Sequence, residues 1–249
     1  MREKEIESNI IANKKLDLIR DRAIDFIRKN IGKIKEKDVS RFIVSEIKKE
    51  GMILDKINPI HFVVTNENTD DNHWNKKIWN FKVINENCLI MIDYWAKLKG
   101  AKNVFADITW MFYVGNKIPK EIENTFNKVI NARNLAVSFI KENLKIGIFP
   151  KAKDIDKTVR DYFAKFNLER FFTHKTGHAL GYSSCHGSKF FISKNSRKTI
   201  GQNILFTIEP GLYFSRKFGI RSEINCYINK DNKLIITSSV QDKIVKIKI

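Results

Sequence analysis

Side chains able to bind a metal ion or to transfer a proton concentrate between residues 174 and 223. This stretch holds three of the chain's five histidines, His174, His178 and His186, and two glutamates, Glu209 and Glu223. Each lies beside a glycine or at the end of a short apolar run, which is how strands deliver polar side chains to a shared site. Imidazole and carboxylate groups are ligands for divalent cations. The stretch therefore predicts half of a metal site.

Two aspartates upstream supply the other half. Asp93 and Asp107 each interrupt an apolar run, residues 89–92 and 104–106, that otherwise predicts a buried strand. A lone buried carboxylate costs free energy, whereas two that face a divalent cation are neutralised by it. We therefore expect both aspartates to meet His178, Glu209 and Glu223 in one site.

One imidazole and four carboxylates form a donor set that is rich in hard oxygen ligands. It favours Mn²⁺, Co²⁺ or Fe²⁺, also fits Zn²⁺, and excludes all-thiolate chemistry. Five such ligands are more than one ion uses easily, so we expect two divalent ions that share bridging carboxylates. A water held between two cations loses a proton near neutral pH, because one metal ion already lowers its pKa to about 7. The resulting metal-bridging hydroxide can attack a peptide carbonyl.

Four short motifs surround these residues in a fixed order: Asp107-Ile108-Thr109, Gly177-His178-x-x-Gly181, Thr207-Ile208-Glu209-Pro210-Gly211 and Arg221-x-Glu223. Together with Asp93 they resemble the pita-bread metallopeptidases, which include Xaa-Pro dipeptidases, Xaa-Pro aminopeptidases and methionine aminopeptidases. The resemblance runs from about residue 10 to the C-terminus. It covers the catalytic domain and leaves out the extra N-terminal domain of many Xaa-Pro peptidases. It implies an α+β fold with a curved antiparallel sheet covered by helices.

The resemblance also implies a role for each metal ligand. Asp107 and Glu223 would bridge the two ions, Asp93 would bind one ion, and His178 and Glu209 would bind the other. Glu209 is similar to the carboxylate that accepts a proton in the family. The spacing between Asp93 and Asp107 is wider than in many family members, and we expect the longer turn to absorb the difference.

Three further histidines resemble substrate-facing residues of the family. His73 and His186 would bind the carbonyl or amine groups of the substrate and stabilise charge in the tetrahedral state. His174 would line the pocket for the residue after the scissile bond. The family histidine usually falls where this chain has Cys185, so we interpret His186 as displaced by a one-residue insertion. His61, inside an apolar run, is expected to be a core or edge histidine.

Arg221 lies two residues before Glu223, so we expect both side chains on one face of a strand, with the guanidinium orienting a carboxylate ligand. This Arg-x-Glu pattern and the short spacing in sequence between Glu209 and Glu223 favour the Xaa-Pro branch over methionine aminopeptidase. Within the same stretch, His174 and His178 have the spacing of a helix-borne zinc pair. The glycines at 177 and 181 disfavour a helix there, and Lys175 stands where a zincin has its glutamate.

Length and composition limit the class of protein. With 249 residues, 43% of them hydrophobic, the chain can bury a sizeable core. The three cysteines lack the spacing of a disulfide framework or a zinc knuckle. The charged N-terminus and the absence of a long apolar run predict a cytoplasmic protein without a membrane partner. The net charge of +18 raises the question of nucleic acid, but the lysines are scattered without a basic block, which favours a solvated surface.

The spacing of apolar residues predicts one α+β domain over residues 1–249. Helices are expected at 8–30, 37–50, 119–145 and 154–166. Strands are expected at 60–66, 88–94 and 104–114, and an edge hairpin at 226–249.

We therefore predict a dinuclear metallopeptidase that hydrolyses the Xaa-Pro bond of dipeptides or short peptides with proline at the second position. Mn²⁺ is the first candidate for the native ion, and the resemblance leaves a homodimer open. A methionine aminopeptidase or a creatinase-like hydrolase on the same fold is the first alternative. A non-catalytic pita-bread module that binds protein or nucleic acid is the second, and the basic charge is its support.

Overall fold

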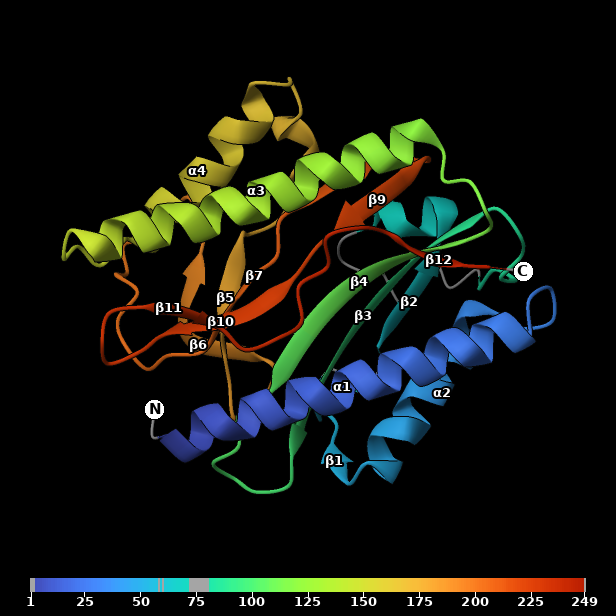
Figure 1. The fold of residues 1–249 in the computed structure, drawn as a ribbon, viewed down its shortest axis with the longest axis horizontal. Helices are drawn as coiled ribbons and strands as arrows, with labels where there is room; N and C mark the ends of the chain where they lie inside the picture. Colours follow the sequence, from blue (N-terminus) through green and yellow to red (C-terminus); the bar gives the residue numbers. More distant parts are fainter. Residues whose placement is uncertain (1–2, 58, 60, 72–80, 249) are drawn as a thin grey trace.

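Two pairs of α-helices cover the strands in the computed structural model, which describes residues 3–57, 59, 61–71 and 81–248 (Figure 1). One pair is α1 (Glu3–Lys29) with α2 (Glu36–Lys49), and the other is α3 (Lys120–Lys145) with α4 (Ala152–Ala164). Helix α1 packs on β3 and β4, and α3 packs on β7, β8, β9 and β11, whose bounds follow. Among the described residues no helix is both long and apolar enough to cross a lipid bilayer.

The strands form two five-stranded sheets and a separate two-stranded ribbon. The first sheet contains β1 (Met52–Ile53), β2 (Phe62–Thr65), β3 (Cys88–Leu98), β4 (Ala106–Val114) and β12 (Val245–Ile247). The second contains β5 (Gly177–Leu180), β6 (His186–Ile192), β7 (Phe206–Ile208), β10 (Ile224–Ile228) and β11 (Leu234–Ile236). The ribbon pairs β8 (Gly211–Phe214) with β9 (Phe218–Arg221). Two short 3-10 helices, η1 (Asn66–Asp70) and η3 (Glu169–Phe171), lie between these elements.

The C-terminal tail differs from the predicted edge hairpin. Strands β10 and β11 do pair in antiparallel register, with Cys226 opposite Ile236. The last strand, β12, instead crosses to the other sheet and runs parallel to β4, with Ile247 opposite Val114. An alternating apolar pattern predicts a strand but not its partner, so the sequence alone could not reveal this crossover.

The predicted helices and strands are confirmed with shifted ends. Helix α1 begins at Glu3 instead of residue 8, and α4 begins at Ala152 directly after Lys151. Strand β2 begins at Phe62, so His61 precedes the strand and is fully buried. The strand ends at Thr65, and Asn66, with a φ of 48°, begins η1.

The two faces of β3 separate the apolar core from the candidate site. Ile90, Ile92 and Tyr94 belong to the core cluster that contains the buried faces of α1 and α2. Leu89 and Met91 point to the opposite face and pack in the cluster with α3 and α4. Because side chains alternate along a strand, the next residues on that second face are Asp93 and Trp95. The sheet therefore presents polar groups at one end of an otherwise apolar surface.

Candidate metal centre

Strands β3 and β4 bring the two aspartates to one face of a hairpin. Asp93 lies opposite Thr109, and Trp95 lies opposite Asp107, so all four side chains point the same way. Both carboxylates are buried. Residues 99–105 link the two strands.

Strand β5 and the residue after β7 place the imidazole beside a third carboxylate. The backbone N–H of His178 donates to Thr207 Oγ1 at 3.1 Å, and the Thr207 hydroxyl donates to Glu209 Oε1 at 3.2 Å. Gly177 permits this approach, because a Cβ there would overlap the carbonyl oxygen of Thr207. The Nδ1 atom of His178 lies 3.1 Å from the carbonyl oxygen of Ala179, which can only accept. Nδ1 therefore carries the proton, and Nε2 is directed to the candidate site with its lone pair.

Glu223 lies in the link between β9 and β10, so our expectation that it shares a strand with Arg221 is wrong. Both side chains are nonetheless buried and line one pocket. Thr109 joins them: its hydroxyl donates to Glu223 Oε2 at 2.8 Å and accepts from Arg221 Nε at 3.0 Å. The guanidinium also donates to Asp93 Oδ2, and to the Tyr213 hydroxyl at 3.2 Å. Arg221 thus holds one candidate ligand directly and a second through Thr109.

The ligand atoms converge. One such atom from each of Asp107, His178 and Glu223 lies within 4.8 Å of the others. The Nε2 atom of His178 is 3.5 Å from Asp107 Oδ2 and also 3.5 Å from Glu209 Oε1. Asp93 lines the same pocket. The structure therefore brings together all five side chains that the sequence predicts as ligands.

Three carboxylate oxygens of this cluster are buried without a hydrogen-bond partner among the described residues: Asp93 Oδ1, Asp107 Oδ1 and Glu223 Oε1. Burial raises the pKa of Asp93 to about 7 although Arg221 opposes the shift, and the charges of Asp107 and Glu209 add to it. Burial and the neighbouring carboxylates also raise the pKa of Glu223 well above its ordinary value. Crowded carboxylates with unpaired oxygens cannot all ionise unless a cation neutralises them. The donor set therefore fits divalent ions.

The pKa of His178 is also raised, through the charges of the carboxylates around it. Burial lowers the pKa of His178, but the facing carboxylates of Asp107 and Glu209 outweigh burial and raise it above the ordinary value. A proton on Nε2 and a divalent cation compete for the same lone pair, so metal binding releases this proton.

The five side chains line a cavity of about 900 Å³. Its walls are aromatic, formed by Phe62, Trp95, Phe172 and Phe191. A volume of this size matches the pockets that enclose most of a small ligand's surface. The cavity therefore has room for a short peptide beside the cluster.

Two of the three predicted substrate-facing histidines line this cavity. The ring of His186 lies 4.4 Å from that of His178, and its Nδ1 is 3.6 Å from the Cys185 sulfur. The register between β5 and β6 shifts between His178 and Leu180, and Leu180 pairs with His186. That His186 is displaced by a one-residue insertion stays a prediction. Nε2 of His174 lies 2.8 Å from the Tyr213 hydroxyl. The third, His73, lies outside the described residues.

Sequence reasoning missed the residues that support the ligands. Thr109, Thr207 and Tyr213 contact the side chains around the cluster, yet we assigned them no role. Thr109 and Thr207 lie inside the motifs, each two positions from a predicted ligand, Asp107 and Glu209, and Tyr213 lies two positions after Gly211. The alternation of side chains along a strand was the signal that could have found them.

Comparison with known proteins identifies the family. The family model "Metallopeptidase family M24" matches residues 10–230. The chain therefore belongs to metallopeptidase family M24. An uncharacterised peptidase of Methanocaldococcus jannaschii is 29% identical over 227 residues, covering 88% of this chain and 58% of that protein. The Xaa-Pro dipeptidase of Pyrococcus horikoshii is 28% identical over 163 residues, covering 66% of this chain and 43% of that protein.

Solved structures confirm the fold. An X-Pro aminopeptidase from Thermotoga maritima superposes with a TM-score of 0.83 at 24% identity, covering 99% of this chain and 64% of that one. A prolidase from Thermococcus sibiricus has the same TM-score and identity and covers 98% of this chain and 61% of its own. The predicted α+β pita-bread fold is thereby confirmed. The chain spans less than two thirds of these proteins' length.

Proposed function

We propose that this chain is a dinuclear metal-dependent peptidase that hydrolyses the Xaa-Pro bond of dipeptides or short peptides. The observation that carries the proposal is the set of three buried, unpaired carboxylate oxygens, from Asp93, Asp107 and Glu223, in the cavity that His178 also lines. A structural role would leave such groups hydrogen-bonded, because an unsatisfied buried acceptor costs about 1–3 kcal/mol or more. Cation binding removes this cost.

The residues that would hold two ions follow from the geometry and the family likeness. Asp107 and Glu223 would bridge, Asp93 would bind one ion, and His178 with Glu209 would bind the other. Mn²⁺ is our first candidate, and Co²⁺, Fe²⁺ and Zn²⁺ also suit the donors. Divalent ions in such a site polarise a peptide carbonyl and lower the pKa of a coordinated water to about 7.

The chain's own side chains supply the remaining steps. Glu209 receives the proton released during attack on the carbonyl and returns it to the leaving amine, since it lies at the cluster's edge and is partly exposed. Burial and the neighbouring His178 lower the pKa of His186, which favours the neutral imidazole, able to donate one hydrogen bond and to accept another. His186 and His73 would bind the substrate's carbonyl or amine groups. His174 would face the residue after the scissile bond.

Two observations support the proposed preference for proline: the names of related proteins and the residues that line the cavity. The named Xaa-Pro dipeptidase and X-Pro aminopeptidase share the family or the fold. The aromatic walls of the cavity suit an apolar pyrrolidine ring. We treat residues 1–249 as one catalytic domain, because both helix pairs pack on strands that border the same cavity.

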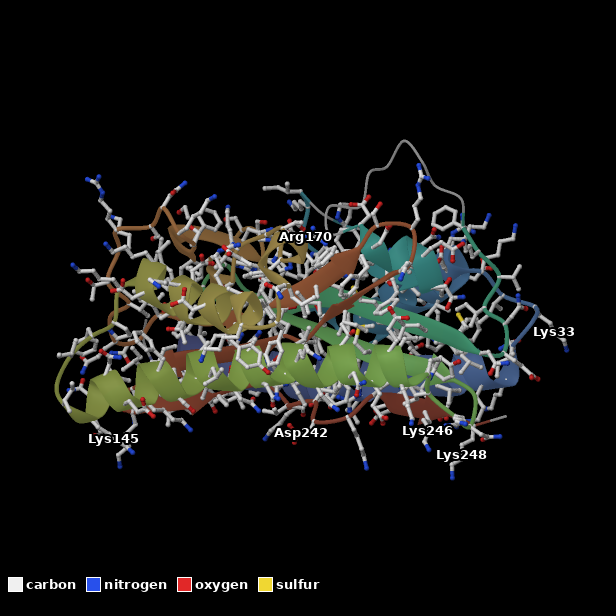
Figure 2. All side chains as sticks on the ribbon, turned by 90° about the horizontal axis from the view of Figure 1, so that it is seen from above. Lys33, Lys145, Arg170, Asp242, Lys246 and Lys248 are labelled. Atoms are coloured by element: carbon white, nitrogen blue, oxygen red, sulfur yellow. The ribbon has the colours of Figure 1, made fainter. Side chains whose placement is uncertain are left out.

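A non-catalytic module that binds nucleic acid is the rival that the charge of +18 supports. Figure 2 shows Lys145 at one end of the molecule and Lys33 at the other, with Lys246 and Lys248 close together near the C-terminus. Scattered surface lysines favour solubility over a defined nucleic-acid footprint. This distribution supports the peptidase proposal.

The test is hydrolysis of Ala-Pro and Gly-Pro by protein reconstituted with Mn²⁺, with Met-Ala as the comparison substrate. The proposal expects cleavage of the proline dipeptides that requires the metal and is abolished by Asp107→Ala. Faster cleavage of Met-Ala would favour a methionine aminopeptidase. No cleavage, together with salt-sensitive binding to nucleic acid, would favour the module.

A further inference from the structure

Helix α3 carries a buried arginine next to the chain segment that holds Glu223. The helix packs on β9, and 0% of the side-chain surface of its Arg133 is exposed. The guanidinium uses all five of its N–H groups: two from Nη1, two from Nη2 and one from Nε donate hydrogen bonds. Burying a charge costs free energy that an apolar side chain in the same place would not. The contacts of this guanidinium therefore need an explanation.

The Nη1 atom of Arg133 holds two segments that both support Glu223. It donates to Ser222 Oγ and to the carbonyl oxygen of Gln241, each at 2.8 Å. Ser222 is fully buried and is the residue between Arg221 and Glu223. One nitrogen thus ties the helix to the link between β9 and β10 and to the segment before β12.

Ser222 connects the two glutamates of the candidate site. Its backbone N–H donates to the carbonyl oxygen of Pro210 at 3.3 Å, and Pro210 directly follows Glu209. Its hydroxyl is held by Arg133, and its own carbonyl forms the peptide bond to Glu223. A shift of Ser222 would therefore move the backbone of one candidate ligand and the neighbour of another.

Gln241 extends the same support to β4. Its side-chain amide donates to the carbonyl oxygen of Met111 at 2.7 Å, and its Oε1 accepts from the Met111 N–H at 2.9 Å. Met111 lies two residues after Thr109, whose hydroxyl donates to Glu223 Oε2 at 2.8 Å. The guanidinium is thus connected to Glu223 both through the main chain at Ser222 and through β4.

The other contacts of Arg133 lie at the surface. Asp242 Oδ1 is 3.3 Å from Nη2, and the side chain of Asp242 is 78% exposed. Asn134, which is also exposed, accepts from Nε at 3.1 Å and from Nη2 at 2.9 Å. Exposed ion pairs stabilise a protein only weakly. The buried bonds of Nη1 are therefore the contacts that can justify a buried charge.

We propose that Arg133 is a positioning residue for the metal centre, which acts through Ser222 and Gln241 to fix the carboxylate of Glu223 where a divalent ion can bind it. Without an ion the crowded carboxylates repel one another, so a ligand that is not held in place would move away from the others. The inference rests on the metal centre of the proposed function and adds a residue that does not line the cavity.

The experiment measures the affinity of the full chain for Mn²⁺, after removal of metal with EDTA and dialysis, by competition with a metal indicator. The variants are Ser222→Ala, Arg133→Met, the double variant and the control Asp242→Asn. Ser222→Ala removes one bond of Nη1 and leaves the guanidinium its remaining acceptors. Asp242→Asn is the matched control, because it changes a surface contact of the same guanidinium and keeps the accepting Oδ1.

Ser222→Ala is expected to raise the Kd for Mn²⁺ about 10-fold, and Arg133→Met about 10- to 100-fold, as when hydrogen-bond partners of metal ligands are removed. The double variant should match Arg133→Met, because the serine hydroxyl acts through the guanidinium and the two effects are not additive. Asp242→Asn should bind Mn²⁺ as the wild type does. Urea unfolding with EDTA present measures the stability of each variant separately from its metal affinity.

An unchanged Kd in Ser222→Ala would overturn the inference while leaving the metal centre and the peptidase proposal intact, and this variant is decisive even if Arg133→Met does not fold. A lower urea midpoint with an unchanged Kd would indicate a structural role and would also overturn it, as would additive losses in the double variant.

A wild-type chain that binds no Mn²⁺ would overturn the metal centre and this inference together. The expected loss of affinity in Ser222→Ala, combined with no cleavage of Ala-Pro by the Mn²⁺-loaded wild type, would support the inference and overturn the proposed Xaa-Pro activity.

Discussion

Replacing Asn225 by Ala should destabilise the chain and displace a candidate metal ligand in one step. Asn225 is fully buried on β10 and bridges the two sheets behind the cavity. Its Oδ1 accepts from the backbone N–H of Asp107 at 3.1 Å and from Asn13 Nδ2 at 3.3 Å, and its own amide donates to the carbonyl of Asp107. Both backbone groups of Asp107 thus depend on one side chain.

The size of the effect follows from those contacts. Alanine leaves a buried N–H and a buried C=O of Asp107 without a partner, at about 1–3 kcal/mol for each group. We therefore expect a loss of about 2–6 kcal/mol from a total stability of roughly 5–15 kcal/mol. A chain of this size should lose about 2–4 °C in Tm for each kcal/mol.

The assay is urea unfolding at pH 7 in the presence of EDTA, so that metal binding does not mask the change. Asn124→Ala is the control, because Asn124 is exposed on α3 and its loss should change the free energy of unfolding by less than about 0.7 kcal/mol. After Mn²⁺ is restored, Asn225→Ala should also hydrolyse Ala-Pro more slowly, since a small displacement of a ligand is costly for rate. A free energy of unfolding within about 0.5 kcal/mol of wild type would refute the reasoning.

Three further outcomes are expected. Glu223→Gln removes one of the crowded carboxylates at constant volume, so at pH 8 with EDTA this variant should unfold at a higher urea concentration than the wild type. With Mn²⁺ it should lose at least ~100-fold in activity. A lower unfolding midpoint with EDTA would argue against repulsion among the carboxylates. The folded-state pKa of Asp93, about 7, lies above the ordinary 3.8, so protonation of this carboxyl stabilises the fold at low pH. With EDTA present, this stabilisation should be lost as the pH rises from about 4 to about 7. A urea midpoint that rises across this pH range in the wild type, but not in Asp93→Asn, would contradict the prediction. Tyr213→Phe removes the hydroxyl that contacts both His174 and Arg221. This variant should lower kcat about 10-fold while the amount of bound metal stays the same. An unchanged kcat would show that the hydroxyl is dispensable.

The sequence predicted which residues share the candidate site better than it predicted how the strands connect and pair. Asp93 and Asp107 each interrupt an apolar strand pattern, and a buried charged group in such a pattern needs a compensating partner. That local rule predicted that the two aspartates share a site with His178, and the structure places all three in one cavity.

The missing details concern relations between distant segments. Periodicity gave no information on the partner of β12, and it placed Arg221 and Glu223 on one strand, whereas β9 ends at Arg221 and Glu223 lies in the link to β10. The bonds from Asn225 to Asp107 span 118 positions. Pairing across such distances is set by packing of the folded sheets, which propensity and spacing do not encode.

Metal content is the most direct test of the central claim, that buried side chains from separate strands converge to hold a pair of cations. The chain is stripped with EDTA, dialysed against Mn²⁺ and analysed for metal per chain by mass spectrometry, beside Asp107→Ala and the surface control Asn124→Ala. The account predicts two ions per chain for the wild type and the control, and one or none for Asp107→Ala. A wild-type chain that retains no metal, or an Asp107→Ala chain that retains as much as the wild type, would contradict it.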